Sequence, residues 1–98
     1  MAAYRFFDIL EETDPVKMQE YRNQVFPVVA QYGGKHLVIG GQLEPVEGNW
    51  RPAFPVLIEF PSLEQAHRWY NSVEYRGLKE LRLAPTKGHA VFMAGAAI

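Results

Sequence analysis

Aromatic and aliphatic residues dominate the first segment of the chain, residues 3–10 (AYRFFDIL), with polar residues only at Arg5 and Asp8. This content predicts a β-strand, whose successive side chains point to opposite faces. One predicted face carries Tyr4, Phe6 and Asp8, and the other carries Arg5, Phe7 and Ile9.

The spacing changes to three and four residues over the next segment, residues 13–34, which predicts an α-helix. Its apolar face consists of Met18, Tyr21, Val25, Val28 and Tyr32. Thr13 or Asp14 can cap the first turn, because a side-chain oxygen accepts an unpaired backbone N–H, and Pro15 fits that turn since it lacks this group. Pro27 removes a hydrogen bond further along, and we therefore expect a kink or a break there.

Two glycine pairs enclose the next apolar run, residues 32–41 (YGGKHLVIGG). A phosphate-binding loop of the G-x-x-x-x-G-K-[ST] kind places its glycines before a helix, whereas Gly33 follows the predicted helix and His36 follows Lys35. Gly33 instead fits the left-handed residue that ends a helix. Residues 35–41 then form a second strand, and its closing glycines indicate a bulge or a close approach to the backbone.

The second half of the chain shows the same kinds of signal. Ser62 and Gln65 have the spacing of a capping box, which predicts the start of a helix. Proline and glycine mark the connections. The expected elements are a loop over 42–52, a strand over 53–60, a helix over 61–72, a shorter helix over 72–85 after a bend near Ser72, and a strand over 88–98.

The resulting order, β-α-β-β-α-β, predicts the ferredoxin-like α+β fold, in which one antiparallel sheet carries the helices on one face and residues 1–98 make a single domain. The last two predicted strands carry apolar residues on both faces. In the first of them, Phe54, Val56, Ile58 and Phe60 lie on one face and Leu57 on the other. In the second, Val91 and Met93 lie on one face and Ala90, Phe92 and Ala94 on the other. A sheet with one hydrated face alternates apolar and polar residues, so both faces must be covered. We therefore expect a homodimer that packs sheet to sheet.

The composition excludes several classes of function. Ten basic and eleven acidic residues give a net charge of -1, unlike the basic excess of nucleic-acid binders. The absence of cysteine excludes disulfides, thiol catalysis and cysteine metal sites. We expect no cofactor, because no cofactor motif is present, and no metal site, because the histidines lack metal-binding spacing. No signal-peptide pattern opens the chain and no apolar run approaches the roughly 20 residues that span a bilayer, so we expect a cytoplasmic protein without membrane contact.

Four motifs, YGGKHLVIGG, EGNW, EFPSLEQA and WYNSVEYRGLKELR, resemble the bacterial family called domain of unknown function 1330. The resemblance covers nearly the whole chain in the right order. It implies the ferredoxin-like fold and the dimeric α+β barrel assembly, whose architecture is similar to that of small monooxygenases, muconolactone isomerases and polyketide cyclases. Ligands of those proteins lie between the sheet and the helices or in the barrel. The family implies no reaction, so no catalytic residue follows from the resemblance.

Three residues are candidates for proton transfer. Glu59 interrupts an apolar strand, and burial would raise its pKa and suit it to acid–base chemistry, whereas a paired or solvated strand-end carboxylate is the alternative. Asp8, near the end of the first strand, has the same two interpretations. His36 can carry a proton if it faces a cavity, and is otherwise an ordinary strand or surface residue.

Five further residues are candidates for ligand binding: Tyr32, Trp50, Arg51, Tyr70 and Arg82. Core packing, with the hydroxyl groups finding hydrogen-bond partners, is the ordinary interpretation of the tyrosines. Trp50 lies in the predicted loop EGNWRP, where it can fold back onto its own sheet, line the mouth of a ligand site or reach across the dimer. Arg51 and Glu47 beside it can hold a carboxylate or pair with each other. Arg82 and Lys79 can form an anion site, although their spacing also fits a solvated charged face of a helix.

Two functions fit these residues. The first is a small-molecule binding protein or enzyme with a cleft lined by Tyr32, Trp50, Glu59 and Tyr70. Its ligand would be conjugated or carboxylate-bearing, and its reaction would be cofactor-free proton-transfer or oxygenase-type chemistry. The second is a non-catalytic dimer that acts as an interaction or structural module. An open cavity with Glu59 unpaired favours the first, and a filled interior with Glu59 paired favours the second.

Overall fold

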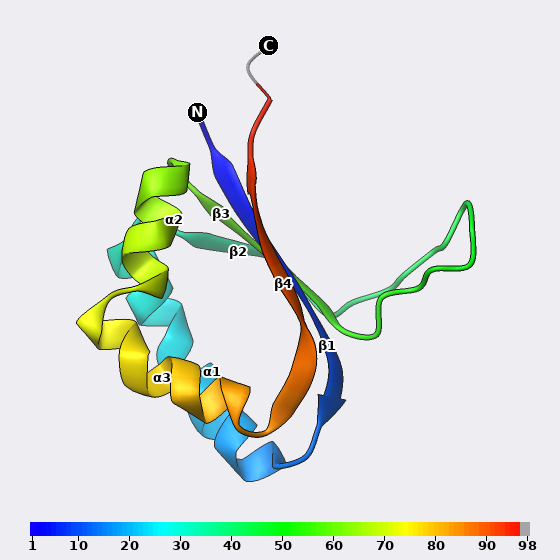
Figure 1. Cartoon of the computed structure of the whole chain (residues 1–98), viewed down its shortest axis with the longest axis horizontal. Helices are drawn as coiled ribbons and strands as arrows, with labels where there is room; N and C mark the ends of the chain where they lie inside the picture. The colour runs from blue at the N-terminus through cyan, green and yellow to red at the C-terminus, as the bar shows by residue number, and fades with distance from the viewer. Residues whose placement is uncertain (97–98) are drawn as a thin grey trace.

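The computed structural model describes residues 1–96 of the 98-residue chain and consists of one sheet and one layer of helices (Figure 1). The elements are β1 (Ala3–Glu12), α1 (Pro15–Gln31), β2 (Lys35–Ile39), β3 (Pro55–Phe60), α2 (Leu63–Tyr70), α3 (Val73–Leu83) and β4 (Thr86–Ala94). The strands are ordered β2-β3-β1-β4, and each neighbouring pair is antiparallel. This is the expected ferredoxin-like α+β fold. The last strand ends earlier than predicted, and its predicted residues 97–98 lie outside the described residues.

Helix α1 begins as its sequence predicts. Asp14 caps it by accepting a hydrogen bond from the backbone N–H of Lys17 (3.1 Å), and Pro15 is its first residue. The helix continues through Pro27, so of the kink or break expected there, the break does not occur. Pro27 and Asn23 are both exposed. The Asn23 carbonyl, which loses its donor to the proline, can therefore be hydrated, so the lost hydrogen bond costs little.

The Gly33–Gly34 pair ends α1. Gly33 has a φ of 78°, in the left-handed region, and the two N–H groups donate to the carbonyls of Ala30 and Val29 at 2.9 Å. A Cβ atom at Gly34 would lie 2.5 Å from a Val29 methyl and 2.7 Å from the ring of Phe60. The pair is therefore a helix stop that also allows close packing, as predicted, and not a phosphate loop.

Serine caps begin both α2 and α3. Ser62 accepts from the N–H of Gln65 (3.0 Å), and Ser72 accepts from the N–H of Tyr75 (3.1 Å), which confirms the bend near Ser72. The predicted capping box forms only in part, because the Gln65 side chain donates instead to the backbone oxygen of Tyr32 (3.2 Å). This bond ties the start of α2 to the end of α1.

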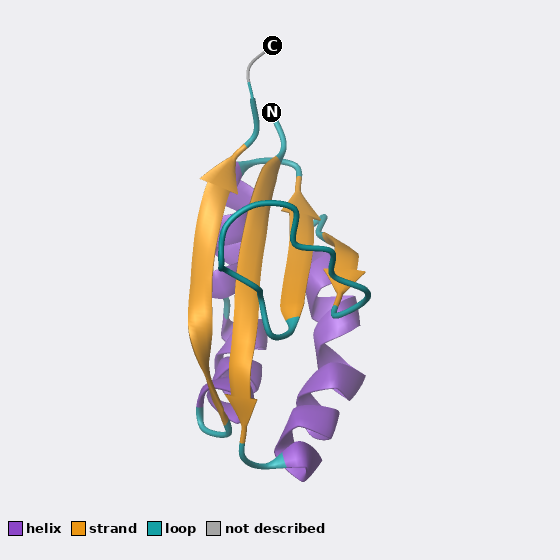
Figure 2. Cartoon of the chain, turned by 90° about the vertical axis from the view of Figure 1, so that its right-hand side faces the viewer, coloured by secondary structure: helices purple, strands orange, loops and turns teal. Residues whose placement is uncertain are grey.

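The helices cover one face of the sheet, and the loop of residues 40–54 projects from the other (Figures 1 and 2). The covered side holds the core, composed of Phe7, Ile9, Met18, Tyr21, Val25, Val29, Val56, Ile58, Phe60, Ala66, Trp69, Tyr75 and Leu78. The open face of the sheet carries Tyr4, Phe6, Val38, Leu57, Val91 and Met93. Val91 and Met93 expose 49% and 44% of their surface there. Both faces are thus apolar, as the sequence predicts. Among the described helices, none combines the length and the apolar character needed to cross a membrane.

Candidate functional site

Arg5 lies in the middle of the helix-covered face of the sheet, where a charged side chain is unusual. It stands opposite Ile58 of β3 and Phe92 of β4 and exposes 1% of its surface. Its two terminal nitrogens, Nη1 and Nη2, have no hydrogen-bond partner among the described residues. Burial lowers the pKa of this guanidinium, and the charge of Arg82 lowers it further. Because an unpaired buried charge destabilises a fold, Arg5 indicates a role other than packing.

Aromatic rings surround the Arg5 guanidinium. Its central carbon lies 4.3 Å from the ring centroid of Phe7, 5.2 Å from that of Trp69 and 5.6 Å from that of Tyr70. Such cation–π contacts favour a desolvated cation without neutralising it. Trp69 is fully buried, and its indole N–H also lacks an acceptor among the described residues. The surroundings of Arg5 therefore hold it in position and leave its donors free.

A second arginine, Arg82 of α3, lies close by. It exposes 6% of its surface, and its central carbon is 5.2 Å from the same Phe7 ring. Its Nε donates to the hydroxyl of Tyr75 (3.3 Å), which is 3.0 Å from the hydroxyl of Tyr21. Burial and the neighbouring Tyr75 raise the pKa of Tyr21, so this hydroxyl stays protonated. Arg82 and the tyrosine pair thus extend the group of buried donors that begins at Arg5.

We call these five residues the arginine–tyrosine cluster: Arg5, Arg82, Tyr21, Tyr75 and Trp69. One of the two tyrosine hydroxyls donates its proton to the other hydroxyl. The second hydroxyl proton then has no acceptor within the cluster, because Arg82 is itself a donor to Tyr75. The three ion pairs within residues 1–96 all lie elsewhere. The cluster therefore combines two cations and several free donors with no carboxylate. That combination suits an acceptor-rich anion such as a carboxylate.

A pocket of about 410 Å³ adjoins the cluster between β4, α3 and the end of β1. We call it the β4–α3 pocket. Phe7, Tyr70 and Arg82 form its inner wall, and Thr86 and Lys87 lie at the start of β4 on its outer side. Phe7 and Tyr70 line this pocket and also lie against the Arg5 guanidinium, so the pocket and the cluster share these two rings.

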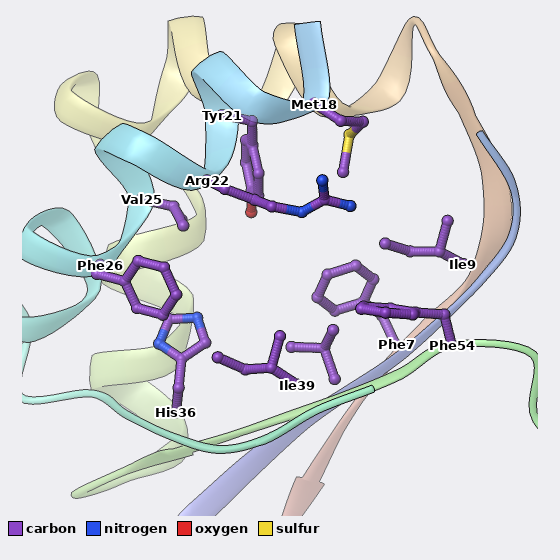
Figure 3. Close-up of a pocket in the computed structure, with 11 residues that line it drawn as sticks. Phe7, Ile9, Met18, Tyr21, Arg22, Val25, Phe26, His36, Ile39 and Phe54 are labelled. Atoms are coloured by element: carbon purple, nitrogen blue, oxygen red, sulfur yellow. The ribbon is translucent and has the colours of Figure 1, made fainter. Parts of the chain in front are cut away.

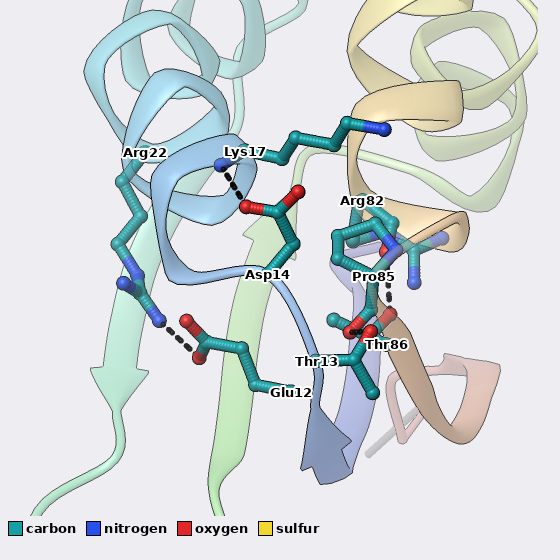
Figure 4. A network of polar contacts seen from close by, with 8 residues as sticks. All are labelled: Glu12, Thr13, Asp14, Lys17, Arg22, Arg82, Pro85 and Thr86. Atoms are coloured by element: carbon teal, nitrogen blue, oxygen red, sulfur yellow. Dashed lines mark hydrogen bonds and ion pairs between the residues drawn. The ribbon is translucent and has the colours of Figure 1, made fainter.

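Polar contacts fix the backbone around this pocket (Figure 4). The N–H and the hydroxyl of Thr13 both donate to the carbonyl of Pro85, at 2.6 and 3.1 Å. The hydroxyl of Thr86 donates to the carbonyl of Arg82 at 2.5 Å. The connection from β1 to α1 is thereby tied to the connection from α3 to β4, and the backbone of Arg82 is held in place.

A smaller cavity, of about 30 Å³, lies on the other side of Phe7, beneath α1 (Figure 3). It is mostly apolar, but His36 and Tyr21 both line it. The His36 ring packs against Phe26 with centroids 4.5 Å apart. Burial lowers the pKa of His36, and the charge of Arg5 adds to this effect. His36 therefore faces a cavity as a neutral imidazole at neutral pH, with room beside it for about two waters.

The stability of the protein should fall in mildly acidic solution because of His36. Its folded-state pKa lies below the ordinary value, so the unfolded chain binds this proton more readily, and stability decreases as pH falls through and below the ordinary histidine pKa. Urea unfolding between pH 7.5 and 5 should show a smaller decrease for His36→Gln than for the wild type. His67→Gln, on the exposed surface of α2, is the matched control. An equal decrease in the wild type and His36→Gln would contradict this assignment.

Asp8 supports the long loop rather than the cluster. Although it exposes only 3% of its surface, its two carboxylate oxygens accept the backbone N–H groups of Ala53 (3.1 Å) and Phe54 (2.7 Å). Carboxylates that accept adjacent backbone donors fix the course of a loop. The carboxylate of Asp8 therefore anchors the end of the 40–54 loop to β1.

Removing this anchor should loosen the loop and destabilise the protein. Asp8→Ala leaves two backbone donors unpaired, and we expect the free energy of unfolding to fall by about 2–3 kcal/mol. Asp8→Asn keeps one acceptor oxygen, so its free energy of unfolding should fall by about half as much. Urea unfolding gives the energies, and limited proteolysis within residues 42–52 reports the loop. Unchanged stability together with unchanged cleavage of Asp8→Ala would show that the anchor is unimportant.

Glu59 lies on the open face, away from the cluster. It accepts a hydrogen bond from the hydroxyl of Tyr4 (3.1 Å), and this bond, with the charge of Glu59, raises the pKa of Tyr4. Glu59 stands opposite Tyr4, and Asp8 stands opposite Pro55. The two carboxylates are therefore four residues apart along the strands, about 13 Å by the usual rise, and do not form a pair.

Three ligand-binding candidates also lie outside the cluster. Tyr32 donates to Glu74 at 2.8 Å, and this bond raises the pKa of the tyrosine. Trp50 is 67% exposed and approaches Phe6 of the open face edge-on, with ring centroids 6.4 Å apart. Arg51 is exposed in the same loop. The predicted cleft of Tyr32, Trp50, Glu59 and Tyr70 is thus spread over both sides of the sheet.

Tyr70 and Arg82 are the sequence candidates that meet at the β4–α3 pocket. Arg82 is not on a solvated helix face, which corrects that interpretation. Tyr75, Leu78 and Arg82 recur at three and four residues and are all buried, so they share the inner side of α3. Sequence reasoning did not identify Arg5, Tyr21, Trp69 and Tyr75 as site residues. The sequence points to Arg5 only through the side-chain alternation of β1, which puts Arg5 on the same face as the core residues Phe7 and Ile9.

The comparisons with known proteins agree with this fold. The sequence profile of a domain of unknown function, DUF1330, matches residues 2–96. No curated protein matches the chain. The chain is similar to a crystal structure of a protein of unknown function from Rhodopseudomonas palustris, with a TM-score of 0.74 at 15% identity over 99% of this chain and 84% of that one.

Two further solved structures are similar in fold. A dimeric protein of unknown function with a ferredoxin-like fold, from Bacteroides fragilis, gives a TM-score of 0.64 at 10% identity over 96% of each chain. SnoaB, a cofactor-independent oxygenase from Streptomyces nogalater, gives 0.62 at 8% identity over 99% of this chain and 93% of that one. At such identities the likeness concerns the fold alone.

Proposed function

The chain belongs to the DUF1330 family, whose name carries no activity, and we propose that it binds a small carboxylate-bearing molecule between its sheet and its helices. The observation that carries the proposal is the buried guanidinium of Arg5, whose terminal nitrogens have no partner within residues 1–96. A carboxylate entering the β4–α3 pocket would meet Arg82 on the inner wall and reach Arg5 after a turn of Phe7 or Tyr70. Guanidinium and carboxylate groups match because they form two parallel hydrogen bonds.

The body of the ligand should be flat and conjugated. The rings of Phe7 and Tyr70 and the aliphatic side chains of Ile9 and Leu83 form the apolar part of the pocket wall. The polar part consists of Asp8, Arg82, Thr86, Lys87 and His89. Rings stack on conjugated groups, and aliphatic walls exclude water from them. A ligand with a carboxylate at one end and an unsaturated or aromatic skeleton would satisfy both parts of the site.

The same proposal includes a homodimer of the α+β barrel type, formed through the open face. Phe6, Leu57, Val91 and Met93 make that face apolar, and a second copy would bury it. A neighbour in fold, from Bacteroides fragilis, is itself described as dimeric. Dimerisation would leave the arginine–tyrosine cluster on the outer, helix-covered side of each sheet.

One observation favours ligand binding without catalysis over an enzymatic reaction. Asp8 and Glu59, the carboxylates that the sequence offers as bases, take part in structural hydrogen bonds at the loop and on the open face. A reaction at the cluster would instead be a proton transfer through Tyr21, Tyr75 and the neutral His36. Cofactor-free oxygen chemistry on a conjugated ligand is the corresponding enzyme proposal, and SnoaB lends it an analogy of fold only.

A thermal unfolding titration tests binding. Benzoate should raise the midpoint temperature by about 5 °C or more at saturating concentration, because the ligand binds only the folded chain. Benzamide has the same shape without the charge and should have little effect. Equal shifts with both compounds would contradict a carboxylate site.

Two arginine variants test where benzoate binds. Arg82→Gln should lose most of the benzoate shift, because it removes the cation on the pocket wall. Arg76→Gln, an exposed arginine of the same helix, should keep it. A loss of equal size in both variants would mean that benzoate responds to surface charge rather than to the cluster.

A further inference from the structure

We infer that the ligand of the arginine–tyrosine cluster is a small dicarboxylate, with one carboxylate for each guanidinium. The inference rests on the proposed function and specifies the charge of the molecule that the site accepts. It follows from the number of buried charges, their separation and the apolar surface between them.

The arginine–tyrosine cluster holds two positive charges and has no carboxylate among its own members. Arginine stays protonated in proteins, so Arg5 and Arg82 both remain cationic. Neither takes part in an ion pair of the described residues. Asp8 also borders the pocket, but its oxygens are bound to the backbone of the loop. A monocarboxylate would leave one buried cation uncompensated, whereas a dianion would neutralise both.

The two cations are close enough for one small molecule to contact both. Their central carbons lie 4.3 and 5.2 Å from the centroid of the same ring, that of Phe7. They are therefore separated by no more than the sum of these distances. The Phe7 ring contacts both guanidinium groups, and once it turns aside a benzene ring or a short carbon chain with an acid group at each end would span such a gap. The ends of the molecule would replace the missing acceptors of Arg5 and Trp69 as well.

The apolar walls favour a dicarboxylate over a compact inorganic dianion. The pocket beside Arg82 includes Phe7, Ile9, Tyr70 and Leu83. A phosphate ion would leave these side chains against water, and would itself lose much of its hydration there. A carbon skeleton between two carboxylates would cover them. Lys87 at the edge of the pocket is 3.8 Å from Glu11, so its charge is already opposed.

Calorimetric titration with a matched pair of ligands tests the inference. Isophthalate and its monomethyl ester share one skeleton and differ by one charge. Wild-type protein should bind isophthalate at least about tenfold more tightly than the ester, because a second charge-assisted contact forms. In Arg82→Gln both ligands should bind more weakly than they bind the wild type, and isophthalate should lose its advantage over the ester, whereas Arg76→Gln should keep the wild-type ratio.

Equal affinities for isophthalate and the ester would overturn the dicarboxylate inference but leave carboxylate binding intact. Inorganic phosphate binding more tightly than isophthalate would also overturn it, in favour of a compact dianion. If isophthalate, its ester and benzoate all fail to bind the wild type, the proposed function fails with it. If Arg82→Gln still binds isophthalate more tightly than the ester, the second carboxylate contacts a site other than Arg82, which would also overturn the inference.

Discussion

The Arg5→Met variant is expected to unfold at a higher urea concentration than the wild-type protein, with a free energy of unfolding greater by about 1–3 kcal/mol. Methionine fills a similar elongated space among Phe7, Trp69 and Tyr70, and its thioether packs well against rings. The variant removes a buried charge that no described residue pairs with. The same change should abolish the stabilisation by benzoate, so the variant should be more stable than the wild type but unable to bind the ligand.

Arg76→Met is the control for this variant, because Arg76 is exposed and should change stability by less than about 0.5 kcal/mol. Both variants should be compared at one protomer concentration, since dimerisation adds to apparent stability. A clear loss of stability in Arg5→Met would mean that the guanidinium serves the fold. That result would remove the main support for an anion site.

The Val91→Asp variant is expected to be monomeric. Val91 stands opposite Phe6 on the open face and is 49% exposed in the single chain. A charge placed there would be buried in the proposed sheet-to-sheet interface, and it would occur in both copies. We expect the dissociation constant of the dimer to rise by more than about 100-fold, as measured by analytical ultracentrifugation.

Val73→Asp is the matched control, because Val73 is 77% exposed at the start of α3, on the helix layer. It should remain dimeric. If the wild type sediments as a monomer, or if both variants dissociate alike, the open face is not the interface. Retention of the dimer by Val91→Asp would place the contact on another surface.

The order of elements was predictable because each is marked locally. The alternation of β1, the Asp14 cap and the Ser62 cap all appear in the structure as expected. The continuation of α1 through Pro27 was not predictable, because the cost of the lost hydrogen bond depends on solvent exposure, which the sequence does not specify. The apolar character of both sheet faces was also readable, since it needs only the side-chain period of two.

The candidate site was less predictable, because its members come from four separate elements. Arg5 is on β1, Tyr21 on α1, Trp69 on α2 and Arg82 on α3. Periodicity shows which face of an element each residue occupies, but not which residues meet across the core. Arg5 was assigned to the face of Phe7 and Ile9, and only the three-dimensional arrangement shows that no acid accompanies it.

The free donors of the cluster connect stability with binding. A buried cation that lacks a partner lowers the stability of the ligand-free chain, and an anion would recover that free energy on binding. The aromatic cage around Arg5 lessens the cost while keeping the charge available. A site of this kind would discriminate strongly against neutral molecules of the same shape, since they leave its donors unpaired.

The most direct test of the anion site is a nuclear magnetic resonance titration of the two tryptophan indole N–H groups with isophthalate. The chain has two tryptophans, so each spectrum contains its own control. Trp69 is buried in the cluster with a free indole donor, and Trp50 is 67% exposed in the distant loop. We expect a saturable shift of the Trp69 signal with little change at Trp50, and loss of that shift in Arg5→Met. An unchanged Trp69 signal at saturating isophthalate and benzoate would contradict an anion site in this protein.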